Sequence, residues 1–396
     1  MLTYNAHMAK LDTLRTLPDP VLPGQLSTAP LLPAPTLCVV VPVLNERDNI
    51  VPMAARLRAA LDGLAWEAVF VDDDSTDGTR DAVMAIGRED SRIRLLHRIG
   101  RRGLASAFIE GVGCSIAPFV AAIDGDQQHD EALLPRMLGI LQTEPVDIVV
   151  ASRYVPGGDL GDWSRRRASL SSLATRIGRF VLRTDIADPM SGFFMLPRPV
   201  FDSAARGLSA IGFKVLLDLL ASMPEPPRVR ELPYRFRTRI SGTSKLDAGV
   251  LLDFVLLLLD KLLGGLLPVR FVLFAAIGLL GLAAHLAVLR IGLTVAGLSF
   301  GQAQAVATAC AIGANFTLNN RFTFRDRRLR GAALLRGLLV FGLVCGVGAL
   351  ANLNVSSLLL NAGHQDWWRA GLAGAAMSLV WNYAVGSTLT WRVRAR

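Results

Sequence analysis

Cysteine is scarce in this chain of 396 residues, and its placement excludes several classes of protein. Four scattered cysteines are present, with no CxxC pair among them: Cys38, Cys114, Cys310 and Cys345. This spacing argues against a disulfide framework and against a zinc site, and it favours a reduced cytosolic or intramembrane setting. The N-terminal stretch lacks the apolar core of a signal peptide. Residues 1–35 are rich in proline, and we expect a flexible leader there.

Glycine-rich phosphate loops are also missing. No GxGxxG sequence follows the first apolar run, which argues against a dinucleotide cofactor, and the lack of a GK[ST] sequence argues against a P-loop ATPase. No histidine stands in an obvious pattern with a carboxylate that would indicate a strong catalytic base. The net charge is +9, but many arginines flank apolar segments, so the basic excess indicates membrane orientation rather than a nucleic-acid partner.

What the chain does contain is an uneven distribution of apolar residues. Hydrophobic residues make up 52% of the sequence, and the mean hydropathy is +0.40. The excess lies after residue 249, whereas the earlier part has a mixed composition. We therefore expect four parts: the leader at 1–35, an α/β domain at 36–247, an interfacial amphipathic helix region at 248–267 and a transmembrane domain at 268–396.

The first half alternates short apolar runs with helical patterns. Runs that start at Leu37, Glu67 and Val120 are typical of buried strands, and each is followed by polar residues. This alternation predicts a Rossmann-like, mainly parallel sheet with helices on both faces. Such sheets bind ligands beyond the carboxyl ends of their strands. Three loops fall at these ends: 42–46, 72–74 and 124–128.

The loop at 124–128 carries the clearest chemical signal. Asp124, Asp126 and Gln128 follow a buried run, and their oxygen atoms suit a hard cation such as Mg²⁺ or Mn²⁺. Such an ion commonly bridges phosphates, so the loop indicates a phosphate-bearing substrate. The alternative is a solvated Asp-Gly-Asp turn without a ligand.

Seven pieces of residues 37–247 together resemble the family 2 glycosyltransferases of the GT-A fold, and more narrowly the polyprenol-phosphate (dolichol-phosphate) mannose synthases. In chain order these pieces are 41–46 (VPVLNE), 71–79 (VDDDSTDGT), 124–129 (DGDQQH), 151–154 (ASRY), 188–194 (DPMSGFF), 212–214 (GFK) and 237–246 (RTRISGTSKL).

The resemblance implies roles for individual residues. The nucleotide sugar would be bound by Pro42, Leu44, Glu46, Val71, Asp73, Asp124, Gly125, Asp126, Arg239 and Lys245. The metal would be held by Asp124, Asp126 and Gln128, and the acceptor phosphate by Arg153, Arg167 and Ser171. Asp126, Arg153, Arg167 and Arg239 would be the catalytic set. His129 would lie behind the site.

Some positions depart from the family pattern. Leu44 stands where the family often has tyrosine, which puts one contact to the base or ribose in doubt. Gly125 replaces a common alanine, and Asp130 with Glu131 replaces a usual pair of prolines. Arg167 is chosen from the run 165–167 by its spacing from Trp163.

The second half is expected to cross the membrane four times, at about 269–289, 302–318, 334–358 and 370–389. Basic residues gather on one side of these segments, so both termini and the α/β domain are expected to face the cytosol. The region resembles the GtrA family through 270–278, 315–324 and 381–383. Asn315, Asn319 and Asn382 would hydrogen-bond between helices or line a path for a lipid phosphate.

The sequence thus predicts an α/β GT-A domain followed by an all-α four-helix transmembrane domain. The expected activity is the metal-dependent transfer of a hexose to a polyprenyl phosphate at the cytosolic membrane face, with inversion. The hexose we expect first is mannose, with GDP-mannose as its donor. UDP-glucose is the alternative donor. A lipid-linked sugar translocator or scaffold with a non-catalytic domain is the alternative of another class. The expected partners are the nucleotide sugar, the lipid phosphate and the membrane, and a homo-oligomer is left open.

Overall fold

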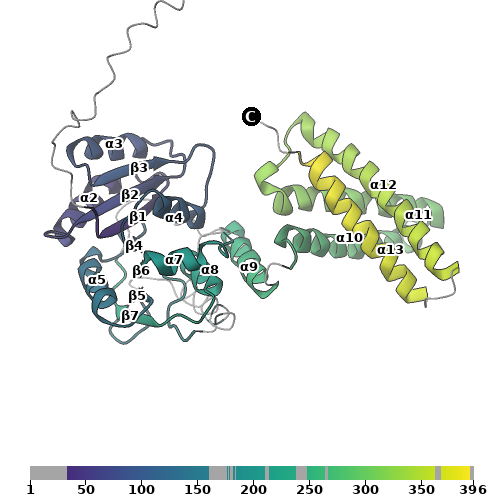
Figure 1. The fold of residues 1–396 in the computed structure, drawn as a ribbon. Helices are drawn as coiled ribbons and strands as arrows, with labels where there is room; N and C mark the ends of the chain where they lie inside the picture. Colours follow the sequence, from purple (N-terminus) through teal and green to yellow (C-terminus); the bar gives the residue numbers. More distant parts are fainter. Residues whose placement is uncertain are drawn as a thin grey trace, which may run out of the picture.

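A computed structural model describes residues 34–159, 176, 178, 182, 184–209, 214–237, 248–263, 266–361 and 367–392. These residues form an α/β domain and a separate group of long helices (Figure 1). Residues 1–33 of the leader expected at 1–35 lie outside the described residues.

A seven-stranded sheet is the centre of the α/β domain, with the order β3-β2-β1-β4-β6-β5-β7. The paired strands β1, β2, β3 and β4 are parallel, as the alternating sequence pattern predicts, whereas β6 runs antiparallel to both of its neighbours. The strands are β1 (Leu37–Val43), β2 (Trp66–Asp72), β3 (Ile93–His97), β4 (Phe119–Ala122), β5 (Ile148–Ser152), β6 (Phe194–Pro197) and β7 (Val229–Pro233).

Helices cover both faces of this sheet, and alternate residues of β1 show why. Val39 and Val41 point into one core, whereas Cys38 and Val40 point into the other, because successive side chains of a strand face opposite sides. The first core is closed by α2 (Arg47–Ala60), α3 (Thr79–Glu89) and α5 (Leu134–Thr143). The second is closed by α4 (Leu104–Gly113), α7 (Arg198–Ala205), α8 (Val215–Ser222) and α9 (Ala248–Leu263).

Helix α9 covers most of the region expected to be interfacial, and one of its faces belongs to the α/β domain. Phe254, Leu257 and Leu258 are buried in the second core. At the end of the helix, Lys261 forms a buried ion pair with Asp218 of α8, with 2.6 Å between Nζ and Oδ1. Residues on its other faces, such as Leu262, are exposed. Its apolar residues thus serve first to dock the helix on the sheet domain.

Four long helices form the second unit: α10 (Val269–Thr294), α11 (Phe300–Leu318), α12 (Ala332–Asn361) and α13 (Trp367–Val385). α10 packs chiefly against α11, and α12 packs chiefly against α13, so the unit consists of two hairpins. In the described chain, Val269–Thr294 and Ala332–Leu359 are long and apolar enough to cross a membrane. An ion pair between Asp253 of α9 and Arg325 joins this unit to the α/β domain.

The two hairpins repeat each other along the sequence. The same number of residues along the sequence separates Phe274 from Phe341 and Phe324 from Trp391. Both pairs touch, with ring centroids 6.5 Å apart for the first pair and 4.2 Å apart in a stacked arrangement for the second. The π-helical turns Asn319–Thr323 and Gly386–Thr390 are separated by the same number of residues. We infer that the domain is a tandem repeat of one hairpin, whose equivalent aromatic residues meet between the two copies.

Asn315 and Asn382 occupy equivalent positions in this repeat, and the expectation that they hydrogen-bond between helices is wrong for both side-chain oxygens. Among the described residues, neither Oδ1 has a hydrogen-bond partner. Each instead lies against a glycine of the other helix in its hairpin, Gly281 and Gly348 respectively. A Cβ atom at either glycine would stand 2.1 or 2.3 Å from that oxygen, so only glycine permits this close packing.

Asn319 is also satisfied locally rather than across helices. Its Nδ2 donates to the Asn315 carbonyl and its Oδ1 accepts from Thr323. The cross-hairpin bond comes from Asn320, whose Oδ1 accepts from Trp391 Nε1 at 3.1 Å. The sequence motif contains Asn320, but nothing in its spacing distinguishes it from Asn319.

Candidate active site

The loops after β1, β2 and β4 meet at one edge of the sheet, as expected. Strand β1 lies between the other two, and its register places Pro42 opposite Val71 and Val40 opposite Ala122. The non-glycine residues of the described chain with a left-handed backbone all lie in these loops: Asn45, Asp74 and Gln127. Such conformations cost energy and gather at functional sites, so they support this edge as the candidate active site.

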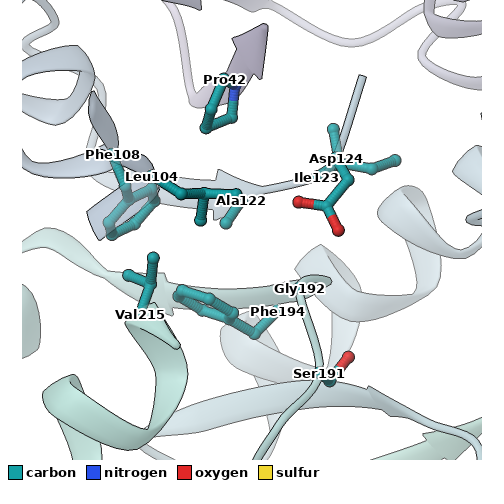
Figure 2. A pocket seen from close by; sticks show the side chains of 10 residues that line it. All are labelled: Pro42, Leu104, Phe108, Ala122, Ile123, Asp124, Ser191, Gly192, Phe194 and Val215. Carbon is teal, nitrogen blue, oxygen red and sulfur yellow. The ribbon is translucent and has the colours of Figure 1, made fainter. Parts of the chain in front are cut away.

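A small pocket lies at this edge, and Asp124 is one of the residues that line it (Figure 2). Its carboxylate lies beside the Ser191–Gly192 turn, across from Pro42. A Cβ atom added to Gly192 would lie 2.5 Å from Asp124 Oδ2, so the absence of a side chain at this position creates the space that the carboxylate fills.

His129 holds Asp124 from behind, in agreement with the expectation for this histidine. The imidazole is buried, with Nε2 3.2 Å from Asp124 Oδ2 and Nδ1 2.9 Å from the Tyr234 hydroxyl. Desolvation opposes ionisation of Asp124, but the hydrogen bond and charge of His129 outweigh it, so the pKa of Asp124 lies below its ordinary value. The chain therefore does contain a histidine–carboxylate pair, and its role is to keep Asp124 charged and in place.

Asp126 and Gln128 lie in the same loop and are both buried. The backbone N–H of Gln128 donates to Asp126 Oδ1 at 3.2 Å, and the Gln128 Nε2 donates to the carbonyl of Arg237 at 3.0 Å. Because Nε2 is used in this way, Oε1 is the amide atom that can ligate a cation. With Asp124, the loop offers two carboxylates and one amide oxygen, a donor set that fits Mg²⁺ or Mn²⁺.

Asp73 is fixed by a buried arginine that the sequence did not single out. Arg98 is 2% exposed, and its Nη1 lies 2.6 Å from Asp73 Oδ1. The backbone N–H of Gly103 donates to the other carboxylate oxygen at 2.7 Å. Gly103 has a φ of 141°, which favours glycine, so this residue contributes both the start of α4 and a donor to Asp73.

The remaining expected nucleotide contacts lie at the same edge. Glu46 Oε2 accepts from Asn49 Nδ2 at 2.6 Å, and Asn49 Oδ1 accepts from Gln127 Nε2 at 3.1 Å, which ties the loop after β1 to the loop after β4. Leu44 is half-buried in the first loop. Gly125 is buried, and a Cβ atom there would lie 2.7 Å from Val43 Cγ1, so a side chain at this position would require Val43 to move.

Arg153 extends from the end of β5 and forms a bidentate ion pair with Asp188. Nε and Nη2 each lie 2.8 Å from a carboxylate oxygen, and the Arg153 backbone N–H also donates to Asp188 Oδ2. Asp188 is fully buried, and its own N–H and that of Ala187 donate to Glu231. Burial opposes the charge on Arg153, but the bonds from Asp188 outweigh it and raise the pKa of Arg153. The guanidinium is thus held in one orientation.

Four of the expected site residues lie outside the described residues: Arg167, Ser171, Arg239 and Lys245. Of the residues that are described, the structure brings Pro42, Asp73, Asp124, Asp126 and Gln128 to one edge. The sequence analysis missed Arg98, Tyr234 and Arg237. Asp188 and Arg237 belonged to quoted motifs, which were the available signals for these two residues.

Comparison with known proteins finds relatives of both the sheet domain and the helical hairpins. The family model for glycosyl transferase family 2 matches residues 38–204, and that for the GtrA/DPMS transmembrane domain matches residues 273–391. A dolichol-phosphate mannosyltransferase of Pyrococcus furiosus is 32% identical over 89% of this chain and 98% of its own length. A dolichol-phosphate mannosyltransferase of Saccharomyces cerevisiae is 34% identical over 55% of this chain and 83% of its own length.

Among solved structures, a glucosyl-3-phosphoglycerate synthase of Mycobacterium tuberculosis in complex with uridine diphosphate is 19% identical, with a TM-score of 0.44 over 57% of this chain and 80% of that one. The P. furiosus relative, by contrast, is similar across both the sheet domain and the helical hairpins. Together with the acidic loop at the sheet edge, that likeness decides the family. The chain belongs to the family 2 glycosyltransferases of the dolichol-phosphate mannosyltransferase type, and it carries a C-terminal GtrA/DPMS transmembrane domain.

Proposed function

We propose that this protein transfers mannose from GDP-mannose to a polyprenyl phosphate at the cytosolic face of a membrane, with inversion at the anomeric carbon. The observation that carries the proposal is the loop Asp124–Gln128, whose oxygen ligands stand at the edge where such sheets bind nucleotides. The relatives of this chain support the substrates: they include dolichol-phosphate mannosyltransferases and a polyprenol monophosphomannose synthase of Mycolicibacterium smegmatis.

The chemistry needs charge stabilisation more than proton transfer. A cation held by Asp124, Asp126 and Gln128 would stabilise the negative charge that grows on the departing nucleoside diphosphate. The acceptor is a phosphate monoester and is anionic near neutral pH, so its oxygen can attack without a strong protein base. His129 is buried behind Asp124 and in contact with Tyr234, which suits it to hold a carboxylate rather than to take a proton from the acceptor.

The chain's cations would gather the phosphates. Arg153 is oriented by Asp188 and would present its guanidinium to the acceptor phosphate. Arg167 and Ser171 would bind the same phosphate. Arg239 and Lys245 would bind the donor diphosphate. Asp73, held by Arg98 and Gly103, would accept hydrogen bonds from the nucleoside together with Glu46.

The donor is tested by incubating the full chain in detergent with polyprenyl phosphate, Mg²⁺ and either GDP-mannose or UDP-glucose. We expect a mannosyl lipid to form from GDP-mannose at a rate at least about tenfold above any glucosyl lipid, because base and sugar contacts discriminate by more than about 1.4 kcal/mol. Efficient transfer from UDP-glucose alone would assign the other donor. No glycolipid from either, with the chain still binding a lipid-linked sugar, would point to a translocator or scaffold.

We also propose that all four helices α10 to α13 span the membrane, with both termini and the α/β domain in the cytosol. The arginines near Arg325 and at Arg392 lie on one side of the hairpins and support this orientation. A cysteine introduced at Arg328, in a chain without its native cysteines, should react with an impermeant maleimide only in inside-out vesicles. Labelling in right-side-out vesicles would contradict the proposed orientation.

A further inference from the structure

The segment that follows β7 runs beside the loop after β4 and contacts it repeatedly. The Tyr234 hydroxyl lies 2.9 Å from His129 Nδ1, and the ring of Phe236 packs edge-on against the same imidazole at 5.6 Å. The Arg237 N–H donates to the Gln128 carbonyl at 2.9 Å, and Gln128 Nε2 donates back to the Arg237 carbonyl at 3.0 Å. The orientation of the Gln128 amide therefore depends on where Arg237 is held.

The side chain of Arg237 holds this residue in position by contacting three consecutive residues of the loop after β4. Nη1 donates to the His129 carbonyl at 3.0 Å and to Glu131 Oε2 at 2.9 Å, while Nη2 donates to Asp130 Oδ1 at 2.6 Å. Glu131 is 3% exposed, and its other oxygen faces Arg56 of α2 at 3.7 Å. A planar guanidinium can satisfy a carbonyl and two carboxylates together, whereas an ammonium or an amide cannot reproduce this fork.

We propose that Arg237 is a positioning residue for the transfer reaction: it clamps the loop 128–131 so that Gln128 Oε1, and with it the Asp126 turn, presents ligating oxygens to the cation and diphosphate. The inference rests on the proposed function. Asp130 and Glu131 both pair with Arg237, at 2.6 and 2.9 Å, so ion pairs hold this part of the loop in place. The clamp acts through Gln128, whose amide it orients.

The test compares Arg237→Gln with Arg235→Gln in the full chain. Arg235 lies two residues earlier in the same segment, is 81% exposed and pairs with Asp159 at 3.3 Å, so it is a matched control for loss of one arginine. The readout is the affinity for Mn²⁺ in the presence of GDP, followed through the electron paramagnetic resonance signal of free Mn²⁺. We expect Arg237→Gln to weaken this affinity about tenfold, because residues that orient metal ligands contribute that much. Arg235→Gln should stay within about twofold, as for an exposed ion pair.

Two further measurements separate positioning from general stability. The melting temperature of each variant is recorded, and Asp130→Asn, which weakens only one arm of the fork, should shift the Mn²⁺ affinity in the same direction by less. Wild-type affinity for Mn²⁺ and GDP in Arg237→Gln would overturn the inference, whether or not the melting temperature falls. If Arg237→Gln does not fold, an unchanged affinity in Asp130→Asn overturns it instead. A wild-type chain that binds neither Mn²⁺ nor GDP would refute the proposed function, on which the inference depends.

Discussion

Replacing Asp126 by alanine is expected to lower the rate of mannosyl transfer by about a thousandfold or more, which corresponds to about 4 kcal/mol of lost charge stabilisation. Asp126 is buried and accepts the Gln128 N–H in the loop that carries the proposed metal ligands. Its loss removes one of two carboxylates and releases the turn that orients Gln128. The rate is measured as glycolipid formed per minute from GDP-mannose and polyprenyl phosphate in detergent.

The matched control is Asp202→Ala, which removes an exposed aspartate from α7 on the same domain. This variant should retain full transfer activity, and both variants should elute as the same species as the unmodified chain in size-exclusion chromatography. An Asp126→Ala variant that transfers mannose at the normal rate would refute the assignment of this loop to the diphosphate.

Asp188→Asn is expected to cause a large loss of stability as well as of activity. The change leaves the Arg153 guanidinium buried without its bidentate counter-ion, and breaking such a pair by removing one partner costs about 3–5 kcal/mol. For a domain of this size we expect the melting temperature to fall by about 10 °C. Unfolding is followed for the full chain in detergent by intrinsic fluorescence.

A second ion pair of the same geometry provides the control. Arg228 donates through its backbone N–H, Nε and Nη2 to Asp147, but this pair lies at the surface, where the Arg228 side chain is 62% exposed. Asp147→Asn should therefore lower the melting temperature much less than Asp188→Asn does. Equal shifts of the melting temperature in the two variants would mean that burial of the Arg153–Asp188 pair has no special importance.

Local sequence patterns were enough to predict the edge of the sheet where the site lies. Each of the loops beginning at Pro42, Asp72 and Asp124 follows an apolar run, and parallel strands bring their carboxyl ends to one edge. The residue types of Asp124, Asp126 and Gln128 likewise predicted a cation site, and that role stays a prediction. These are local properties, and each is visible within about ten residues of sequence.

The partners that hold these residues could not be read in this way. Arg98 reaches Asp73, Tyr234 reaches His129, and Arg237 reaches Gln128 across long stretches of chain. Such contacts depend on strand order, and the order β4-β6-β5-β7, with its antiparallel strand, leaves no periodic signal in the sequence.

The membrane domain shows the same limit. Polar asparagines in apolar helices indicated interhelical hydrogen bonds, which are one solution to their burial. The structure uses another solution at Asn315 and Asn382, because a glycine on the adjacent helix lets the backbone approach the amide oxygen. Predicting this packing from sequence requires knowing which glycine faces which asparagine. The internal repeat of the two hairpins is the one sequence feature that relates the two glycine–asparagine pairs.

The central claim is that oxygen ligands at the end of β4 make the transfer of mannose dependent on a divalent cation. It is tested most directly by assaying transfer from GDP-mannose to polyprenyl phosphate in EDTA and then restoring Mg²⁺ in excess. The account predicts that mannosyl lipid formation stops in EDTA and returns with Mg²⁺, while the chain stays folded throughout. Undiminished transfer in EDTA would contradict it.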